Sequence, residues 1–213
     1  MGMKRAVLFA ASPEAVLPDC AAELARDALV IAVDGGLTLC RSAGIEPDLL
    51  LGDFDSLMEP LPADIPILRH PVRKDDTDIM LAIKHGIACG CRDFTLFGCF
   101  GGRFDHTFAN ISAMLYLRKQ GCTARMLDGA ADMYPLWGTD RVEGDPVNGG
   151  KLSLFPLSEQ ISGVCERGLS YLLEDAVLEN CFPLGVSNAF IGERWSVSIA
   201  EGAAVVIVTK KGE

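Results

Sequence analysis

The stretch LVIAVDGG, residues 29–36, followed by DLLLGDFDS, residues 48–56, decides the fold. Each half opens on a short aliphatic run and breaks into a polar loop at glycine and aspartate. Between the two we expect a short helix that ends at Gly44. A strand that leads through a helix into the next strand is the repeating unit of a parallel sheet, so the sequence predicts an α/β fold.

The same alternation continues on both sides of this stretch. Hydrophobic periodicity predicts helices over Pro13–Ala28, Thr77–Gly90 and Asp105–Gln120, and strands over Ala6–Ala11, Ile65–Arg69, Phe94–Phe97 and Thr123–Leu127. The first helix would start with Pro13 behind a Ser12 cap. We expect residues 1–135 to form one α/β sandwich domain, a mostly parallel sheet covered by helices.

The remainder of the chain has a different character. A cluster of glycine and proline residues indicates a turn-rich linker: Gly138, Gly144, Pro146, Gly149 and Gly150. Short β segments without a helical period follow it: Lys151–Phe155, Ser170–Leu173, Ala176–Leu178, Trp195–Ile199 and Ala204–Thr209. We expect residues 145–213 to form a smaller, all-β sandwich domain.

Composition excludes several classes of partner. A net charge of −10 disfavours a nucleic-acid backbone, because such binding depends on clustered Lys and Arg. The eight cysteines are scattered and form no CxxC pair, so neither a zinc site nor a disulfide scaffold is expected. No apolar run approaches the roughly 18 residues of a membrane span, and the first residues do not resemble a signal peptide. We expect a cytoplasmic protein that binds neither nucleic acid nor membrane.

Asp53 and Asp55 follow directly on a predicted strand. If the strand conformation persists, both carboxylates point to one face. Two such charges about 5 Å apart repel by about 3 kcal/mol at an effective dielectric constant of about 20. Magnesium removes this conflict, because it takes carboxylate oxygens and shares its other positions with phosphates. An acidic turn that caps the next segment is the alternative interpretation.

Two further polar loops are expected to converge on the same edge of the sheet, where open parallel sheets bind ligands. Residues 75–78, Asp-Asp-Thr-Asp, open a helix, and they favour either helix capping or a carboxylate cluster that includes Asp75 and Asp78. Residues 101–106, Gly-Gly-Arg-Phe-Asp-His, combine amides that can approach a phosphate with the forked donors of Arg103. Asp105 would cap the helix or position Arg103, and His106 is either packed or a ligand contact.

Six short motifs, in order along the chain, resemble those of the thiamine pyrophosphokinases, particularly the bacterial form. They are Asp34-Gly35-Gly36, Gly52-Asp53-Phe54-Asp55-Ser56, Asp75-Asp76-Thr77-Asp78, Gly102-Arg103-Phe104-Asp105-His106 with Asn110, Gly168-Leu169-Ser170-Tyr171, and Gly185-Val186-Ser187-Asn188. They span nearly the whole chain. The resemblance implies an N-terminal domain that binds ATP, a C-terminal sandwich that contributes to a thiamine pocket, and a homodimer.

The resemblance also implies roles for particular residues. Magnesium would be held by Asp53, Asp55 and Asp78. ATP, the co-substrate, would be bound by Asp34, Gly35, Gly36, Thr77, Gly102, Arg103, Asp105 and His106. Thiamine would lie near Tyr171, Ser187 and Asn188. Because these residues follow Asp132 and the phosphate and metal residues precede it, we also expect a composite site to which two subunits contribute. The expected catalytic set is Asp53, Asp55, Asp75, Asp78 and Arg103.

The implied reaction is attack of the thiamine hydroxyl on the β-phosphorus of ATP, which gives thiamine pyrophosphate and AMP. One alternative is a magnesium phosphohydrolase with Asp53 as a covalent nucleophile, but such enzymes favour D-x-D-x-[TV] and Leu57 takes the last place. Another alternative is a non-catalytic module that senses nucleotides. Acid-stable label on thiamine without an aspartyl-phosphate would exclude the first alternative, and release of AMP that depends on thiamine would exclude the second.

Overall fold

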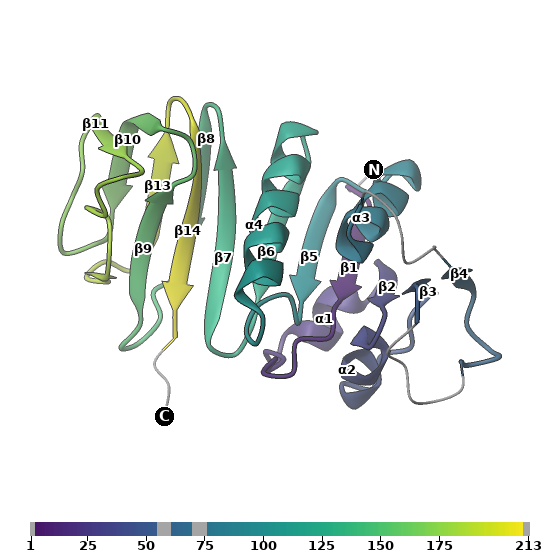
Figure 1. Cartoon of the computed structure of the whole chain (residues 1–213). Helices are drawn as coiled ribbons and strands as arrows, with labels where there is room; N and C mark the ends of the chain where they lie inside the picture. The colour runs from purple at the N-terminus through teal and green to yellow at the C-terminus, as the bar shows by residue number, and fades with distance from the viewer. Residues whose placement is uncertain (1–2, 55–60, 70–75, 211–213) are drawn as a thin grey trace. The chain divides into compact units, whose positions relative to one another are not determined.

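The computed structural model describes residues 3–54, 61–69 and 76–210 (Figure 1). The chain divides into two compact units, Met1–Asp128 and Gly129–Glu213. No helix in the described residues is long and apolar enough to cross a bilayer.

The N-terminal unit is built on a parallel sheet with the strand order β6-β5-β1-β2-β3-β4. Its strands are β1 (Arg5–Phe9), β2 (Leu29–Val33), β3 (Leu49–Gly52), β4 (Ile67–Arg69), β5 (Asp93–Phe97) and β6 (Thr123–Leu127). The central strands are almost fully buried, which explains why they read as continuous aliphatic and aromatic runs rather than alternating ones.

Four helices of the described chain pack on this sheet: α1 (Ala21–Ala25), α2 (Gly36–Ser42), α3 (Asp78–Ala88) and α4 (Phe104–Lys119). α3 packs on β1, β2 and β3 and lies beside α4, which packs on β6 (Figure 1). It starts where Thr77 Oγ1 accepts a hydrogen bond from Met80 N at 3.2 Å, and Ile79 and Ile83 lie on its buried face. α3 and α4 therefore form where the hydrophobic period predicted them.

The order of the strands reverses between β1 and β5. From β1 the chain steps outward through β2, β3 and β4, and then returns to β5 and β6 on the other side of β1. Right-handed crossovers in opposite directions place α1 and α2 on one face and α3 and α4 on the other. The loops after β1 and β5 consequently separate, which opens a crevice at the carboxyl ends of these two strands.

The C-terminal unit contains antiparallel sheets that share one core. One has the order β12-β9-β14-β7 and the other the order β11-β10-β13-β8. The strands are β7 (Ala131–Trp137), β8 (Asp140–Gly144), β9 (Lys151–Pro156), β10 (Gln160–Arg167), β11 (Ala176–Glu179), β12 (Asn188–Ala189), β13 (Trp195–Ile199) and β14 (Ala203–Thr209). Buried residues of both sheets, among them Leu154, Val164, Trp195 and Val206, make up the core.

The predicted fold class is confirmed in both parts: a mostly parallel α/β domain is followed by an antiparallel β sandwich. The predicted helix over Pro13–Ala28 is wrong in its first half, because α1 covers only Ala21–Ala25. Pro18 explains the difference, since an interior proline lacks the amide that a helix needs. Its carbonyl instead accepts from Ala21 N at 2.9 Å, just before α1.

The predicted linker over residues 138–150 is wrong, because it contains β8. Gly138, with a φ of 66°, forms the tight connection from β7 to β8. Gly144 is a strand residue that lies under the ring of Trp195, where an added Cβ would come within 2.8 Å of the ring. These glycines therefore serve turns and close packing within the sandwich.

The strand predicted over Ser170–Leu173 is absent from the structure, whereas β10 was not predicted. β10 was obscured by a register shift between Ile161 and Val164 and by Gly163, which has a φ of 63°. Leu169 forms only an isolated bridge with Phe190. An irregular segment between Gly168 and Leu173 results.

The close approach of α2 to β1 gives the first testable prediction. A Cβ on Gly36 would lie 1.9 Å from the backbone oxygen of Phe9, which cannot move aside without shifting β1. We expect Gly36→Ala to lower the free energy of unfolding of the N-terminal unit by about 3 kcal/mol. Chemical denaturation followed by far-UV circular dichroism measures it, because the described helices all lie in that unit.

Gly44→Ala is the matched control. Gly44 follows α2 with a φ of 68°, and nothing lies within 4 Å of an added Cβ. Only the cost of the left-handed backbone, about 1 kcal/mol, should appear. Equal losses of stability for the two variants would contradict the proposed packing constraint at Gly36.

Candidate functional site

A pocket of 590 Å³ lies at the carboxyl edge of the N-terminal sheet. It is bounded by the loops after β1, β2 and β5 and by the first turns of α3 and α4, so it occupies the crevice where the strand order reverses. The size suits a ligand of nucleotide dimensions. Its walls are Ala10, Ala11, Ser12, Pro13, Val33, Asp34, Gly35, Thr77, Asp78, Ile79, Gly98, Cys99, Gly101, Gly102, Arg103, His106, Ala109 and Asn110.

The floor of the pocket is backbone from the ends of β1 and β5. Ala10 N donates to Phe97 O at 2.9 Å, and Ser12 N donates to Gly98 O at 3.0 Å. Gly98 has a φ of 64°, and a Cβ there would meet Ala10 O at 2.4 Å, so only glycine fits. The buried hydroxyl of Ser12 has no hydrogen-bond partner among the described residues. This hydroxyl is therefore a polar atom in the pocket wall that is left for a ligand.

The loop after β2 places a carboxylate against the end of β3. Asp34 has a φ of 48°, and its amide donates to Leu51 O at 2.9 Å. A Cβ on Gly52 would lie 1.7 Å from Asp34 Oδ1, so the carboxylate rests directly on the glycine that precedes Asp53. Position 52 therefore requires glycine, because the Asp34 carboxylate occupies the space that a Cβ would need.

The strand conformation ends before Asp53. β3 ends at Gly52, and Phe54 has a φ of 59°, which breaks the alternation of side chains. The expectation that the two carboxylates share one face assumed a strand that continued beyond Gly52, and β3 does not. The Phe54 ring packs against the Ala32 and Leu50 core, with the Arg69 guanidinium 5.7 Å from its centroid. Asp55 lies outside the described residues.

At the start of α3, Thr77 and Asp78 line the pocket. Thr77 is the N-cap of α3, and its hydroxyl accepts a hydrogen bond from the helix backbone. Of the two interpretations of residues 75–78, helix capping is therefore confirmed for Thr77. Asp76 forms an ion pair with Lys84 at 2.6 Å. Asp75, the expected partner of Asp78, lies outside the described residues.

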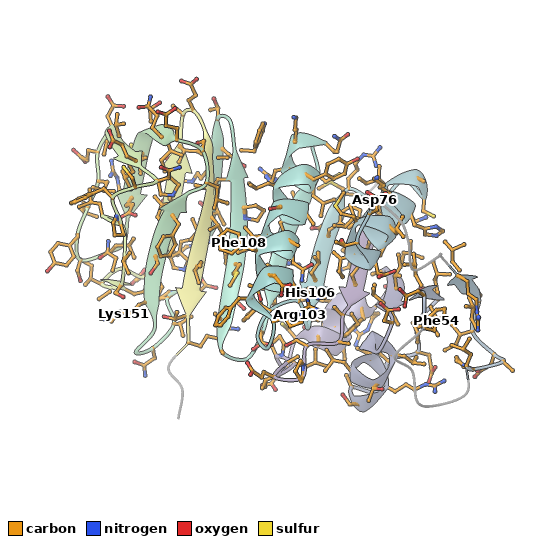
Figure 2. All side chains as sticks on the ribbon, in the orientation of Figure 1. Phe54, Asp76, Arg103, His106, Phe108 and Lys151 are labelled. Atoms are coloured by element: carbon orange, nitrogen blue, oxygen red, sulfur yellow. The ribbon has the colours of Figure 1, made fainter. Side chains whose placement is uncertain are left out.

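At the start of α4, Arg103 and Asp105 form a two-bonded pair (Figure 2 labels Arg103 and His106). Arg103 Nε donates to Asp105 Oδ1 at 3.1 Å, and Nη2 donates to Oδ2 at 2.5 Å. The hydrogen bond from Arg103 lowers the pKa of the Asp105 carboxyl to about 2. Of the two predicted roles for Asp105, the structure has it orienting Arg103, and it also accepts from His106 N at 3.0 Å.

The glycine pair of this loop is engaged by a residue that the sequence did not suggest. Gly102 N donates to Glu14 Oε2 at 3.0 Å. Glu14 therefore occupies one of the amides that we expected to face a phosphate. A phosphate that uses this amide has to displace the carboxylate.

The structure brings together in one pocket most of the residues predicted to bind the nucleotide: Asp34, Gly35, Thr77, Gly102, Arg103 and His106. Asp78, predicted as a metal ligand, lines the same pocket. Gly36, Asp53 and Asp105 lie outside its walls. Ser12, Gly98 and Cys99 were missed as wall residues, because they follow strands without any charged neighbour. Asn110, noted only as part of a motif, donates from Nδ2 to Cys99 O at 2.6 Å and ties α4 to the loop after β5.

The acidic residues of this edge fit a magnesium ion by donor chemistry. Asp34 and Asp78 supply carboxylates to the pocket wall, and the Asp34 carboxylate lies on Gly52 beside Asp53. Oxygen donors of this kind suit Mg²⁺, which shares its coordination with substrate phosphates. Within residues 3–54, 61–69 and 76–210, no three His, Cys, Asp or Glu side chains are already gathered for a metal.

In the C-terminal unit, the predicted thiamine residues gather around one short segment. Asn188 Oδ1 accepts from Tyr171 N at 3.0 Å, and Asn188 Nδ2 donates to Tyr171 O at 2.6 Å. Ser187 has a φ of 61°, and its amide donates to Ser153 Oγ at 3.0 Å. The Tyr171 side chain is 79% exposed, so its ring is available to a ligand.

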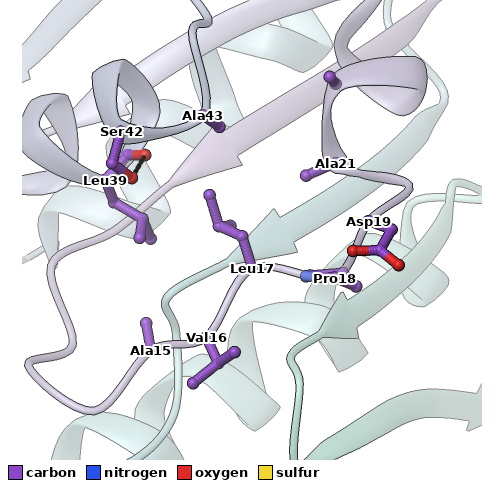
Figure 3. A pocket seen from close by; sticks show the side chains of 10 residues that line it. Ala15, Val16, Leu17, Pro18, Asp19, Ala21, Leu39, Ser42 and Ala43 are labelled. Carbon is purple, nitrogen blue, oxygen red and sulfur yellow. Dashed lines mark hydrogen bonds between the residues drawn. The ribbon is translucent and has the colours of Figure 1, made fainter.

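A second hollow of 480 Å³ lies between two parts of the N-terminal unit (Figure 3). One part is the segment that leads into α1, and the other is α2. Its walls are mostly small or aliphatic, with Leu17 and Leu39 among them. The Ser42 hydroxyl donates to Leu39 O at 2.7 Å, and Asp19 is the carboxylate of the wall. Few polar groups converge here, so this hollow is a weaker candidate than the pocket at the sheet edge.

Comparisons with known proteins cover both units. Residues 21–126 match the family model described as "Thiamin pyrophosphokinase, catalytic domain", and residues 141–204 match "Thiamin pyrophosphokinase, vitamin B1 binding domain". A protein of Bacillus subtilis named "Thiamine pyrophosphokinase" is 30% identical over 212 residues, which cover 96% of this chain and 98% of that one.

Two crystal structures are similar over nearly their whole length. That of the Bacillus subtilis thiamine pyrophosphokinase has a TM-score of 0.87 at 25% identity and covers 98% of this chain and 100% of its own. That of a thiamin pyrophosphokinase from Geobacillus thermodenitrificans has a TM-score of 0.80 at 26% identity, with 99% of each chain covered.

The paired side chains at the start of α4 give the second prediction. Arg103→Lys keeps the charge but loses the two-bonded fork to Asp105, so the cation no longer has a fixed orientation. We expect the KM for ATP to rise about tenfold, which is the effect of losing one charge-assisted hydrogen bond. The KM for thiamine should change less, and steady-state kinetics with each substrate varied measures both.

Arg141→Lys is the matched control, because exposed Arg141 also donates through Nε and Nη2 to a carboxylate two residues on, here to Oε2 of Glu143 in the C-terminal unit. Its kinetics should equal those of the wild type. Normal turnover and normal ATP binding in Arg103→Lys would remove Arg103 from the site.

Proposed function

The chain belongs to the thiamin pyrophosphokinase family, and from that membership we propose how its residues carry out the family's reaction. It is a thiamine diphosphokinase: it transfers the pyrophosphoryl group of ATP to the hydroxyl of thiamine. The observation that carries this conclusion is that catalytic and vitamin-binding models match in order along a chain that aligns end to end with a relative.

We propose that the polyphosphate of ATP binds in the pocket at the sheet edge. Gly35 and the Gly101–Gly102 loop present backbone to it, and Arg103 approaches it from the start of α4. Thr77 and His106 complete the wall. The wall combines apolar side chains such as Val33 and Ile79, which suit the flat faces of a base, with backbone and charged groups for the polyphosphate.

We propose that Asp53, Asp55 and Asp78 hold the magnesium ion. When bound, magnesium neutralises charge on the phosphates and on the leaving group. The thiamine hydroxyl oxygen forms a bond to the β-phosphorus while the bond from this phosphorus to the oxygen shared with the α-phosphorus breaks, and AMP leaves. The hydroxyl proton passes to a carboxylate, for which Asp75 is our candidate.

We propose that thiamine lies against the Tyr171 ring in the C-terminal unit, with Ser187 at its polar edge. An exposed aromatic ring on a fixed backbone offers a flat surface on which the rings of thiamine can stack. In the structure, the polar atoms of Asn188 are used by Tyr171 and Glu166, so its contribution to the ligand is through them.

We propose that the chain works as a homodimer. Large apolar side chains are exposed on the segment between Gly168 and β13: Tyr171, Leu172, Phe182, Leu184, Val186 and Ile191. A second copy of the chain can bury exposed apolar side chains of this segment by two-fold symmetry. We also propose a cytoplasmic location, since all eight cysteines are free thiols.

The reaction is tested directly by incubating the protein with ATP, magnesium and thiamine. AMP and thiamine pyrophosphate should form in equal amounts, and no AMP should form without thiamine. Phosphate or ADP as the product, or an aspartyl-phosphate on the protein, would point to the phosphohydrolase alternative. Nucleotide binding without any product would point to a sensing module.

The metal assignment gives the third prediction. Asp53→Asn and Asp55→Asn each remove a negative ligand without changing size, so folding should be preserved while kcat falls about a hundredfold or more. Asp19→Asn, in the second hollow, is the matched control and should keep the wild-type kcat. Near-normal rates in both variants at ordinary magnesium concentration would show that the assignment is wrong.

The dimer gives the fourth prediction. The wild type should sediment with twice the 22.8 kDa of one chain. Leu184→Asp places a charge among the exposed apolar side chains and should shift the equilibrium to the monomer. Val16→Asp, at a similarly exposed residue of the N-terminal unit, should leave it unchanged. A wild type that sediments as a monomer at all concentrations would contradict the proposal.

A further inference from the structure

A carboxylate is buried in the core of the C-terminal sandwich. Glu166 on β10 is 2% exposed, and it lies two residues from Val164, on the same core-facing side of the strand. Burial raises the pKa of its carboxyl, and the hydrogen bond from Asn188 opposes that rise. A buried acid without an ionic partner costs stability, and an apolar side chain would pack here without that cost.

One oxygen of Glu166 has a partner and the other has none. Oε2 accepts from Asn188 Nδ2 at 3.1 Å, whereas Oε1 makes no hydrogen bond within the described chain. The carboxyl group of Glu166 therefore makes only half of the hydrogen bonds that its burial calls for. The one side-chain hydrogen bond that is described for it is the bond from Asn188.

Asn188 in turn holds the backbone of Tyr171 at both of its polar atoms. Its Oδ1 accepts from Tyr171 N at 3.0 Å, and its Nδ2 donates to Tyr171 O at 2.6 Å. The side chain thus takes the place of a paired strand for a segment that has no ladder of its own. Glu166 supports this orientation of the amide, because its Oε2 accepts a second hydrogen bond from Nδ2.

The residues held in this way are those proposed to contact thiamine. The Tyr171 ring is 79% exposed while its backbone is clamped, and Ser187, next to Asn188, is held in a left-handed conformation by Ser153. Glu166 N also donates to Leu173 O at 3.0 Å, which fixes the other end of the segment. Buried polar groups thus set the positions of exposed ones.

We infer that Glu166 is a positioning residue for the thiamine subsite, which acts through Asn188 to hold Tyr171 and Ser187 in the geometry that binds the vitamin. The inference rests on the proposed placement of thiamine at these residues. It goes further in naming a residue that does not touch the ligand and that the family motifs do not include. It also predicts an effect on one substrate and not on the other.

The test compares Glu166→Met with Glu166→Gln. Glu166→Met removes the acceptor while keeping the volume, so the protein should be at least as stable as the wild type to heat. Its KM for thiamine should nonetheless rise about tenfold, with the KM for ATP unchanged. Glu166→Gln keeps an acceptor for Asn188 and should restore the KM for thiamine to within about twofold of the wild type.

Glu159→Met, at an exposed position just before β10, is the control and should change neither KM. If Glu166→Met does not fold, Glu166→Asp replaces it: the charge stays but the shorter side chain no longer reaches Asn188, and the same selective rise is expected. Folded Glu166→Met or Glu166→Asp with an unchanged KM for thiamine, or with equal changes for both substrates, overturns the inference. A wild type that makes no AMP with thiamine overturns the proposed function and this inference together.

Discussion

The reversal of strand order between β1 and β5 is the constraint on which the N-terminal unit depends. Because parallel strands need crossovers of one hand, the reversal forces the loops after these strands apart and leaves a crevice there. The glycines of this edge follow from it: Gly98 has no room for a Cβ beside Ala10, and Gly36 has none beside Phe9. The first turns of α3 and α4 then open onto the same space.

The two units position the polar groups of their candidate sites by different means. In the N-terminal unit, backbone at strand ends and helix starts lines the pocket, and the side chains added to it are short or charged. In the C-terminal unit, buried side chains replace missing strand pairing: Asn188 holds Tyr171, and Glu166 holds Asn188. The two substrates of the family, a polyphosphate and an aromatic vitamin, call for these two different kinds of surface.

Much of the fold was predictable, because the spacing of apolar residues along the chain indicates which face of a helix or strand is buried. α3 carries a regular apolar face and the central strands carry continuous apolar runs, and both lie where the sequence predicts them. The failures have local causes: Pro18 prevents a long first helix, and Gly163 interrupts β10. Within the site, charged residues such as Arg103 could be found from the sequence. Ser12 and Glu14 could not, because only the fold brings them beside Gly101 and Gly102.

The central claim is that the acidic edge of the sheet receives a polyphosphate only together with a divalent cation. Calorimetric titration of ATP into the protein, with magnesium and then with a chelator in its place, tests this most directly. Since the chain carries a net charge of −10 and the pocket contains Asp34 and Asp78, ATP should bind in magnesium and show no measurable heat without it. Equal affinity under both conditions would contradict the account.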